Sequence, residues 1–370
     1  MGKQLLHTPE GVRDIYGTEY EKKLNVEQLL HERIALYGYN DIQTPSFEFF
    51  DVFGSDIGTT PSRELYKFFD KEGNTLALRP DFTPSIARCA AKYFMEESGS
   101  LRFSYLGNAF TNASNLQGKL KETTQMGVEL IGDDSVYADA EVLSVAIEAL
   151  KNSGLKDFQV SVGNAEYFKG LCEEFSFSEE MESTVYEYIS NKNFFGAQEY
   201  LLNENISKDI CNKLLKTGEL VGSVEVLKTA EALADNKRSK VALTRLLELY
   251  TVLQKYGIEQ YVSFDLGMLT QYHYYTGMIF KVYTYGVGDA VAKGGRYDSL
   301  LAKFGKKAPA IGFVILIDDL MQALTRQSVL ENSQDDKRIL TYTDEDFAAV
   351  LEEAKELRNA GIVVEMRRGI

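Results

Sequence analysis

The helical signal of residues 166–256 constrains the fold of this chain more than any other sequence feature. Within it, residues 243–253 carry an apolar stripe at helical spacing, which predicts a packing surface. Strand-like sequence lies before this region at residues 158–162 and after it at residues 261–267 and 278–285. One sheet must therefore be assembled from segments on both sides of a long helical stretch. This arrangement predicts an α+β fold with a largely antiparallel sheet and a helical insertion.

Helix and strand signals alternate through the remainder of the chain. Residues 19–36 predict a helix that stops at Gly38. Thr83-Pro84 predicts a second helix start, with Thr83 as the N-cap and Pro84 at the first helical position. Residues 310–320 are typical of a strand that passes into a helix.

A chain of 370 residues is too long for one ordinary domain. We expect residues 1–165 and 257–325 to form one core and residues 166–256 to be inserted into it. Residues 329–337 are polar and predict a linker, and residues 338–370 have a short β-α-β pattern.

Composition excludes several classes of protein. Apolar residues make up 44% and charged residues 26%, as in a globular protein, and no apolar run has the length of a membrane span or a signal peptide. We therefore expect a cytoplasmic protein. The net charge of −15 is weak evidence against nucleic-acid binding. Cys89, Cys172 and Cys211 show no C-x-x-C spacing, which favours buried thiols over a metal site or a disulfide framework.

Three clusters place polar residues in apolar strand contexts: residues 78–83, residues 124–130, and residues 272–277 together with 294–298. In the second cluster Gln125 and Glu129 fall on one face of a strand at period two. They could point into a ligand pocket, since a buried carboxylate needs a partner. A sheet with one solvated face explains the pattern equally well.

The order of these clusters resembles the class II core of histidyl-tRNA synthetase over residues 8–322. Residues 78–83 resemble the segment that grips the α-amino group of histidine, and residues 125–129 the strand that faces the amino acid. Residues 273–277 are similar to the histidine-specific tyrosine segment, residues 308–313 to the approach to motif 3. Tyr37 to Glu48, which includes Thr44-Pro45, resembles the dimer-forming motif 1. The resemblance implies an antiparallel sheet flanked by helices, and a homodimer formed through the motif 1 region.

The chain departs from the synthetases at their catalytic arginines. By the resemblance, the motif 2 arginine falls at Thr111, the histidine-specific arginine at Thr270 and the motif 3 arginine at Asp319. Lys119 stands where the family has a phosphate-contacting arginine, as a point charge instead of a bidentate donor. Losing one such donor typically lowers the rate about 10²–10³-fold. The resemblance therefore predicts that this chain does not activate an amino acid, and that it needs no cofactor or metal.

Paralogues of this core without the arginines include the regulatory subunit of short-form ATP phosphoribosyltransferase, which the clusters resemble most. That family assembles with a short catalytic subunit and makes the first step of histidine biosynthesis responsive to histidine. The resemblance implies a retained histidine pocket. The residues that it assigns to this pocket are Asp81, Thr83, Gln125, Glu129, Tyr274 and Tyr275. Asp81 stands where synthetases have the longer glutamate.

Two other functions stay open. The chain could be a synthetase-like ligase that acts on an acceptor other than tRNA, or an oligomeric scaffold without a ligand. Residues 338–370 resemble only the first β-α-β unit of the synthetases' anticodon-binding domain. Together with the acidic net charge, this predicts that tRNA is not a partner.

Overall fold

The computed structural model describes residues 6–54, 57, 60–112, 120–268, 275–330 and 337–369. The chain forms two compact units. Residues 1–15 and 23–329 belong to the first unit, and residues 16–22 and 330–370 to the second.

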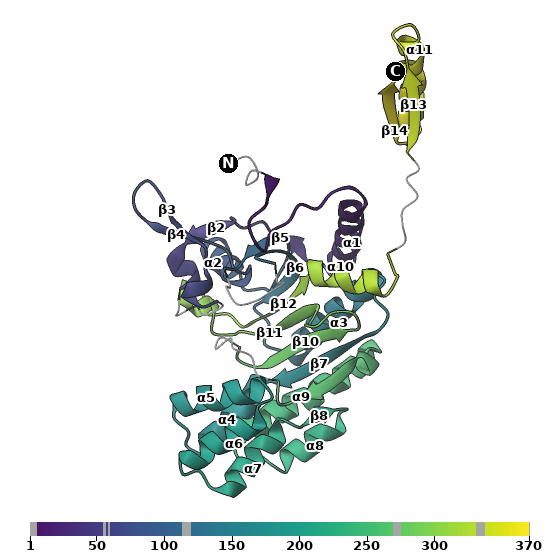
Figure 1. Ribbon diagram of the computed structural model, residues 1–370. Coiled ribbons are helices and arrows are strands. Elements are labelled where there is room, and N and C mark those ends of the chain that lie inside the picture. The colour runs from purple at the N-terminus through teal and green to yellow at the C-terminus, as the bar shows by residue number, and fades with distance from the viewer. Residues whose placement is uncertain are drawn as a thin grey trace. The chain divides into compact units, whose positions relative to one another are not determined.

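The first unit is built on a nine-stranded sheet with the order β1-β5-β6-β12-β11-β10-β7-β9-β8 (Figure 1). Its strands are β1 (Asn40–Asp41), β5 (Leu101–Phe110), β6 (Glu122–Ile131), β7 (Phe158–Asn164), β8 (Val221–Gly222), β9 (Val262–Asp265), β10 (Met278–Thr284), β11 (Ala292–Arg296) and β12 (Ala310–Leu316). Neighbouring strands run antiparallel from β5 across to β7, while β1 pairs parallel with β5 and β9 parallel with β7. The largely antiparallel sheet predicted from the sequence is confirmed.

Helices of the first unit pack on this sheet. They include α2 (Thr83–Tyr93), α3 (Val136–Asn152) and α10 (Ile317–Arg326), and most of α1 (Gly17–Ala35) belongs with them. Helix α3 is apolar around most of its circumference, and Val142, Leu143 and Ile147 are fully buried. Ser135 caps its first turn by accepting a hydrogen bond from the Ala138 amide. A helix buried on several sides indicates a core position between the sheet and its neighbours.

Residues 165–256 are helical apart from the short strand β8. The helices are α4 (Ala165–Glu174), α5 (Glu179–Ser190), α6 (Phe194–Asn203), α7 (Lys208–Thr217), α8 (Glu225–Glu231) and α9 (Lys237–Tyr256). Figure 1 shows them gathered beyond the β7 end of the sheet. Helix α9 buries Leu243, Leu246 and Leu253 from the predicted apolar stripe. The helical content of this stretch agrees with the sequence, whereas its status as a separate domain stays a prediction.

A three-stranded sheet of β2 (Phe47–Phe49), β4 (Thr75–Leu78) and β3 (Lys67–Phe69) also belongs to the first unit. In the second unit β13 (Arg338–Tyr342) pairs parallel with β14 (Val364–Arg368), and α11 (Phe347–Asn359) connects them. This is the β-α-β pattern expected of the tail. Among the described residues no helix is both long and apolar enough to cross a bilayer.

The predicted role of Thr83 as an N-cap is wrong. Thr83 is the first residue of α2, the N-cap is Phe82, and no side-chain hydrogen bond caps this end. Its hydroxyl donates instead to the carboxylate of Glu129 on β6, at 2.7 Å. The Thr83 hydroxyl thus forms a tertiary hydrogen bond instead of the local N-cap hydrogen bond that was predicted. Pro84 lies in the first turn as expected.

Candidate functional site

The candidate site is centred on Glu129, whose side chain is 1% exposed. Thr83 from the start of α2 donates to Oε1, and the hydroxyl of Tyr297, just after β11, donates to Oε2. No cation forms an ion pair with this carboxylate among the described residues. Burial raises the pKa of Glu129 to about 8, the two hydrogen bonds lower it and nearby Asp81 adds to the rise.

Glycines make room for this carboxylate. Gly312 on β12 pairs with Glu129 across the sheet, and a Cβ at this position would overlap Oε2 of Glu129. Gly127, two residues before Glu129, lies against the Tyr105 ring, and a Cβ there would meet the tyrosine hydroxyl and the Phe313 carbonyl. These positions need glycine because side chains of neighbouring strands approach the backbone closely.

Acidic and phenolic groups surround Glu129. Asp81 and Glu129 both add to the rise in the pKa of buried Tyr105, which burial chiefly causes, and Tyr275 adds to it as well. The pKa of Tyr297 is also raised well above its ordinary value, mainly by burial and then by Glu129. The structure therefore brings together five such groups: Asp81 before α2, Tyr105 on β5, Glu129 on β6, Tyr275 before β10 and Tyr297 after β11. At neutral pH the tyrosines are hydroxyl donors.

Gln125 lies on the same strand face as Glu129 and is 9% exposed. Its side-chain amide forms no hydrogen bond with any residue in the described part of the chain. Gln125 pairs in register with Gly107 on β5, where a side chain would collide with Arg79. Both faces of β6 are buried here, so the solvated-face interpretation of this alternation is wrong.

Arg79 holds the segment that leads into α2. Its Nε donates to the Asn108 carbonyl at 2.8 Å and its Nη1 to the Thr44 carbonyl at 2.9 Å. The guanidinium stacks 3.9 Å from the ring centre of Phe82, which in turn stacks on Tyr105. In the described part of the chain the Arg79 guanidinium donates its hydrogen bonds to backbone carbonyls. It therefore fixes the position of the segment that carries Asp81 and Thr83.

Several predicted positions contribute differently. Tyr275 is buried against Gly295, where a Cβ would lie 2.7 Å from its ring. Tyr274, Thr270 and Lys119 lie outside the described residues. Thr111 follows the end of β5, and its amide donates to the Lys121 carbonyl. Asp319 occupies the first turn of α10.

Tyr297 is the residue that the sequence prediction missed. It belongs to the cluster of residues 294–298, but nothing in the pattern distinguishes its side chain from a core tyrosine. Strand alternation places the side chains of Arg296 and Tyr297 on opposite faces of the sheet, but it does not say which face holds a ligand. Gly312 was missed for the same reason, since its pairing with Glu129 is a property of the sheet.

The arrangement suits a small ligand with hydrogen-bond donors. A buried carboxylate, an amide with no hydrogen-bond partner among the described residues and several hydroxyls provide directional acceptors and donors in an otherwise apolar setting. In the described residues no group of three or more His, Cys, Asp or Glu side chains is placed to hold a metal ion. Cys89, Cys172 and Cys211 are free thiols, and the latter two are buried.

Comparison with known proteins gives the family context. The sequence model of the family described as histidyl-tRNA synthetase matches residues 11–320. The chain is 41% identical to an ATP phosphoribosyltransferase regulatory subunit of Acetivibrio thermocellus, over 99% of this chain and 88% of the relative. It is 38% identical to the protein of that name from Ruminiclostridium cellulolyticum, over 99% of this chain and 87% of the relative.

Solved structures agree with this. A protein of Bacillus halodurans described as an ATP phosphoribosyltransferase regulatory subunit/histidyl-tRNA synthetase matches with a TM-score of 0.89 and 34% identity, over 98% of this chain and 93% of the other. A histidyl-tRNA synthetase of a Nostoc species matches with a TM-score of 0.82, over 98% of this chain and 86% of the other. At 20% identity the latter likeness concerns the fold alone.

Proposed function

We propose a regulatory, non-catalytic role in histidine biosynthesis for this chain, which belongs to the family of ATP phosphoribosyltransferase regulatory subunits. The proposed partner is the catalytic subunit of ATP phosphoribosyltransferase, after the name that the relatives carry. The observation that carries the proposal is nearly full-length similarity to these relatives, together with a synthetase-like fold. Co-expression of both chains tests it: a stable complex is expected, and two separately eluting proteins would contradict it.

The proposed ligand of the candidate site is histidine. Glu129 and Tyr297 offer an acceptor and a hydroxyl to a ring with a donor nitrogen, while Gln125, Asp81 and Thr83 offer groups to the zwitterionic end. Without a ligand, burial raises the pKa of Glu129. A ligand that carries a positive charge next to Glu129 would lower this pKa and favour the ionised carboxylate. Tyr274 and Tyr275 complete the proposed set.

Histidine binding is measured by calorimetry on the chain alone and with its catalytic partner. Saturable heat is expected for the wild type, and it should be abolished by Glu129→Gln, which keeps the shape and removes the charge. Glu122→Gln, on the same strand, is the matched control. Equal affinity of the wild type and Glu129→Gln would place the histidine elsewhere.

The lack of synthetase activity is proposed from three positions. Thr111, Thr270 and Asp319 stand where the resemblance to synthetases puts arginines. Asp319 lies in the first turn of α10, so by this resemblance a carboxylate stands where the motif 3 cation would be. An anion there would repel a triphosphate, and the threonines at the other two positions supply no positive charge to it.

The alternative function, a synthetase-like ligase, shares the synthetase-like fold, but the names of the relatives do not favour it. Exchange of radioactive pyrophosphate into ATP in the presence of histidine separates the two. No exchange is expected from this chain. Robust exchange would establish an enzyme and would overturn the regulatory proposal. An assembly with no histidine binding and no partner would instead indicate a scaffold.

A homodimer through the motif 1 region is also part of the proposal. Phe47 and Phe49 on β2 and Phe68 on β3 lie on one face of the three-stranded sheet in this region, and they are 51%, 58% and 37% exposed. A contiguous aromatic surface of this kind is typical of an interface. Light scattering should give twice the chain mass for the wild type, and Phe49→Glu should shift the protein towards the monomer.

A further inference from the structure

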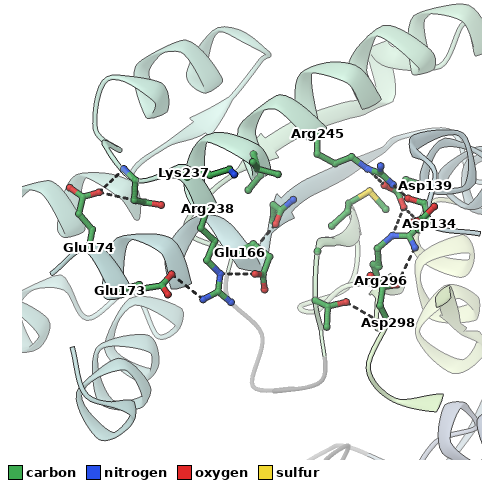
Figure 2. A pocket seen from close by; sticks show the side chains of 17 residues that line it. Asp134, Asp139, Glu166, Glu173, Glu174, Lys237, Arg238, Arg245, Arg296 and Asp298 are labelled. Atoms are coloured by element: carbon green, nitrogen blue, oxygen red, sulfur yellow. Dashed lines mark hydrogen bonds and ion pairs between the residues drawn. The ribbon is translucent and has the colours of Figure 1, made fainter. Parts of the chain in front are cut away.

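A cleft of about 740 Å³ lies between helices α3, α4 and α9 and the segment that leads into β10 (Figure 2). Val241, Ala242, Gly277 and Met278 provide the apolar part of its lining. Val241 is 58% exposed on α9, although it is an aliphatic side chain. The cleft thus offers an uncovered apolar surface within the first unit.

Two groups of ion pairs flank the cleft along α9. Arg238 donates to Glu166 at 2.7 Å and to Glu173 at 3.4 Å. Arg245 donates to Asp139 at 2.7 Å, and Asp139 also accepts from Arg296 at 2.9 Å. Seven residues separate the two arginines, which corresponds to about 10 Å along a helix. Figure 2 shows the two groups of charges on either side of the cleft.

Two charges on the lining remain without a counter-ion. Lys237 at the start of α9 and the carboxylate of Asp134 are exposed, and neither forms an ion pair with another described residue. The rim can therefore accept one acidic and one basic group from an occupant. An apolar centre inside a polar rim is the usual anatomy of a protein–protein interface.

The charge of the lining argues against a phosphorylated ligand. Six carboxylates and four basic side chains line the cleft. The carboxylates are Asp134, Asp139, Glu166, Glu173, Glu174 and Asp298. Five of them are held by arginine or lysine side chains, so the cations are largely neutralised. A polyanion would meet excess negative charge, whereas a protein surface of mixed charge would not.

The position of the cleft suits a partner that differs from a second copy. Strand β1 forms one edge of the nine-stranded sheet, while the cleft lies by β11 and β10, four and five strands away. A two-fold dimer through the β1 region would leave the cleft uncovered, since such an interface uses the same patch on both copies. A complex of this dimer with a different protein needs a second surface patch on each copy.

The cleft also adjoins the candidate histidine site through one strand. Arg296 lines the cleft, and the next residue, Tyr297, donates to Glu129 on the opposite face of the sheet. Thr276, another lining residue, donates its amide to the Arg296 carbonyl and directly follows Tyr275. An occupant of the cleft would therefore rest on residues adjacent to those that contact the proposed ligand.

We propose that this cleft is the docking surface for the catalytic subunit. An apolar side chain of the partner packs on Val241, an acidic residue faces Lys237 and a basic residue faces Asp134. This inference rests on the proposed function, because it takes the partner from it. It adds the surface of contact, which neither the family membership nor the candidate site specifies.

The test is the affinity of the purified chain for the purified short catalytic subunit of the same organism, by biolayer interferometry. Val241→Glu is expected to weaken binding about 30-fold or more, as for a central apolar anchor. The new glutamate can pair with Lys237 and Arg245 four residues away on either side, so the helix should be retained. Leu247→Glu, on the same helix but outside the cleft, is the matched control and should bind within a few-fold of the wild type.

Lys237→Glu is the second variant, and it keeps the test usable if Val241→Glu does not fold. Lys237 is exposed and forms no ion pair with a described residue, so folding should be unaffected, while association should slow and become less dependent on salt. Equal affinity of the wild type and both cleft variants overturns the inference and leaves the proposed function standing. Failure of the wild type to bind overturns the proposed function itself. Loss of the homodimer in Val241→Glu, measured by light scattering, would assign the cleft to a second copy and overturn the inference.

Discussion

Two carboxylates are buried on opposite faces of the same sheet, and they have different kinds of partner. Asp139 on α3 is fully buried and lies between Arg245 and Arg296. Glu129 on β6 is equally inaccessible, but its described partners are the hydroxyls of Thr83 and Tyr297. Asp139 is neutralised by the protein, whereas Glu129 has its pKa raised to about 8.

The difference separates a structural group from a candidate binding group. A buried charge that only supports the fold must be paired, because an unpaired one costs several kcal/mol. A carboxylate left among hydroxyls keeps its electrostatic capacity for a ligand. The contrast predicts that changes at Asp139 act mainly on stability, while changes around Glu129 act mainly on proton and ligand binding.

The largest effect is expected from Asp139→Asn. It leaves Arg245 and the buried Arg296 without their shared anion, and the free energy of unfolding should fall by about 3–5 kcal/mol. Urea denaturation measures this. Asp134→Asn, a nearby exposed position, should change it by less than about 0.5 kcal/mol. A loss below about 1 kcal/mol at Asp139 would break the contrast.

Gly312→Ala should have the next largest effect. The added Cβ collides with Oε2 of Glu129 and with the Val128 carbonyl, so the strand pair must shift, at a cost of about 1–3 kcal/mol. Histidine binding should be lost with it. Gly288→Ala is the control, because no atom lies within 4 Å of a Cβ there. Unchanged unfolding and binding in Gly312→Ala would contradict the tight packing around Glu129.

Glu129→Gln should alter the pH dependence of stability. The ordinary carboxyl pKa is 4.5 and that of folded Glu129 is about 8, so between these values the folded state holds a proton that the unfolded state has lost. Stability from this group is complete below pH 4.5 and is lost as the pH rises to about 8, by at most about 1.4 kcal/mol per pH unit. Asp81, Tyr105 and Tyr297 are the titratable groups that face it.

Chemical denaturation of the ligand-free protein across this pH range measures the slope. The glutamine variant should lack the component that Glu129 contributes to the wild type. Identical slopes in the two proteins would indicate that Glu129 is ionised in the folded state.

The smallest effect is expected from Thr83→Val. It removes one hydroxyl donor to Glu129 without changing the size of the side chain, which should cost about 1 kcal/mol and raise the pKa of Glu129 further. Thr83→Ser keeps the hydroxyl and should behave like the wild type in calorimetry and in unfolding. Equal loss in both variants would mean that packing of the Thr83 methyl group matters, and the hydrogen bond does not.

Periodicity predicted much of the fold. The strands around residues 158–162, 278–285 and 310–316 and the helical stretch to residue 256 were readable because side-chain alternation is a local property. Periodicity could not decide whether the polar face of β6 lines a ligand pocket or faces solvent. Solvation depends on what covers the face, and only the packed structure shows that both faces are buried.

The sequence by itself determined which residues, Thr111, Thr270 and Asp319, stand where the resemblance puts synthetase arginines, and it determined the presence of Glu129 on an alternating strand. Tertiary structure decided what these groups meet. Thr83 and Glu129 are 46 residues apart and Tyr297 is 168 residues from Glu129, so tertiary packing had to bring them together. The pairing of β6 with β12 placed Gly312 opposite Glu129, and the packing of α9 and β11 against α3 placed two arginines around Asp139. Local patterns carry no information on such distant partners, because burial and charge pairing arise only when the strands assemble.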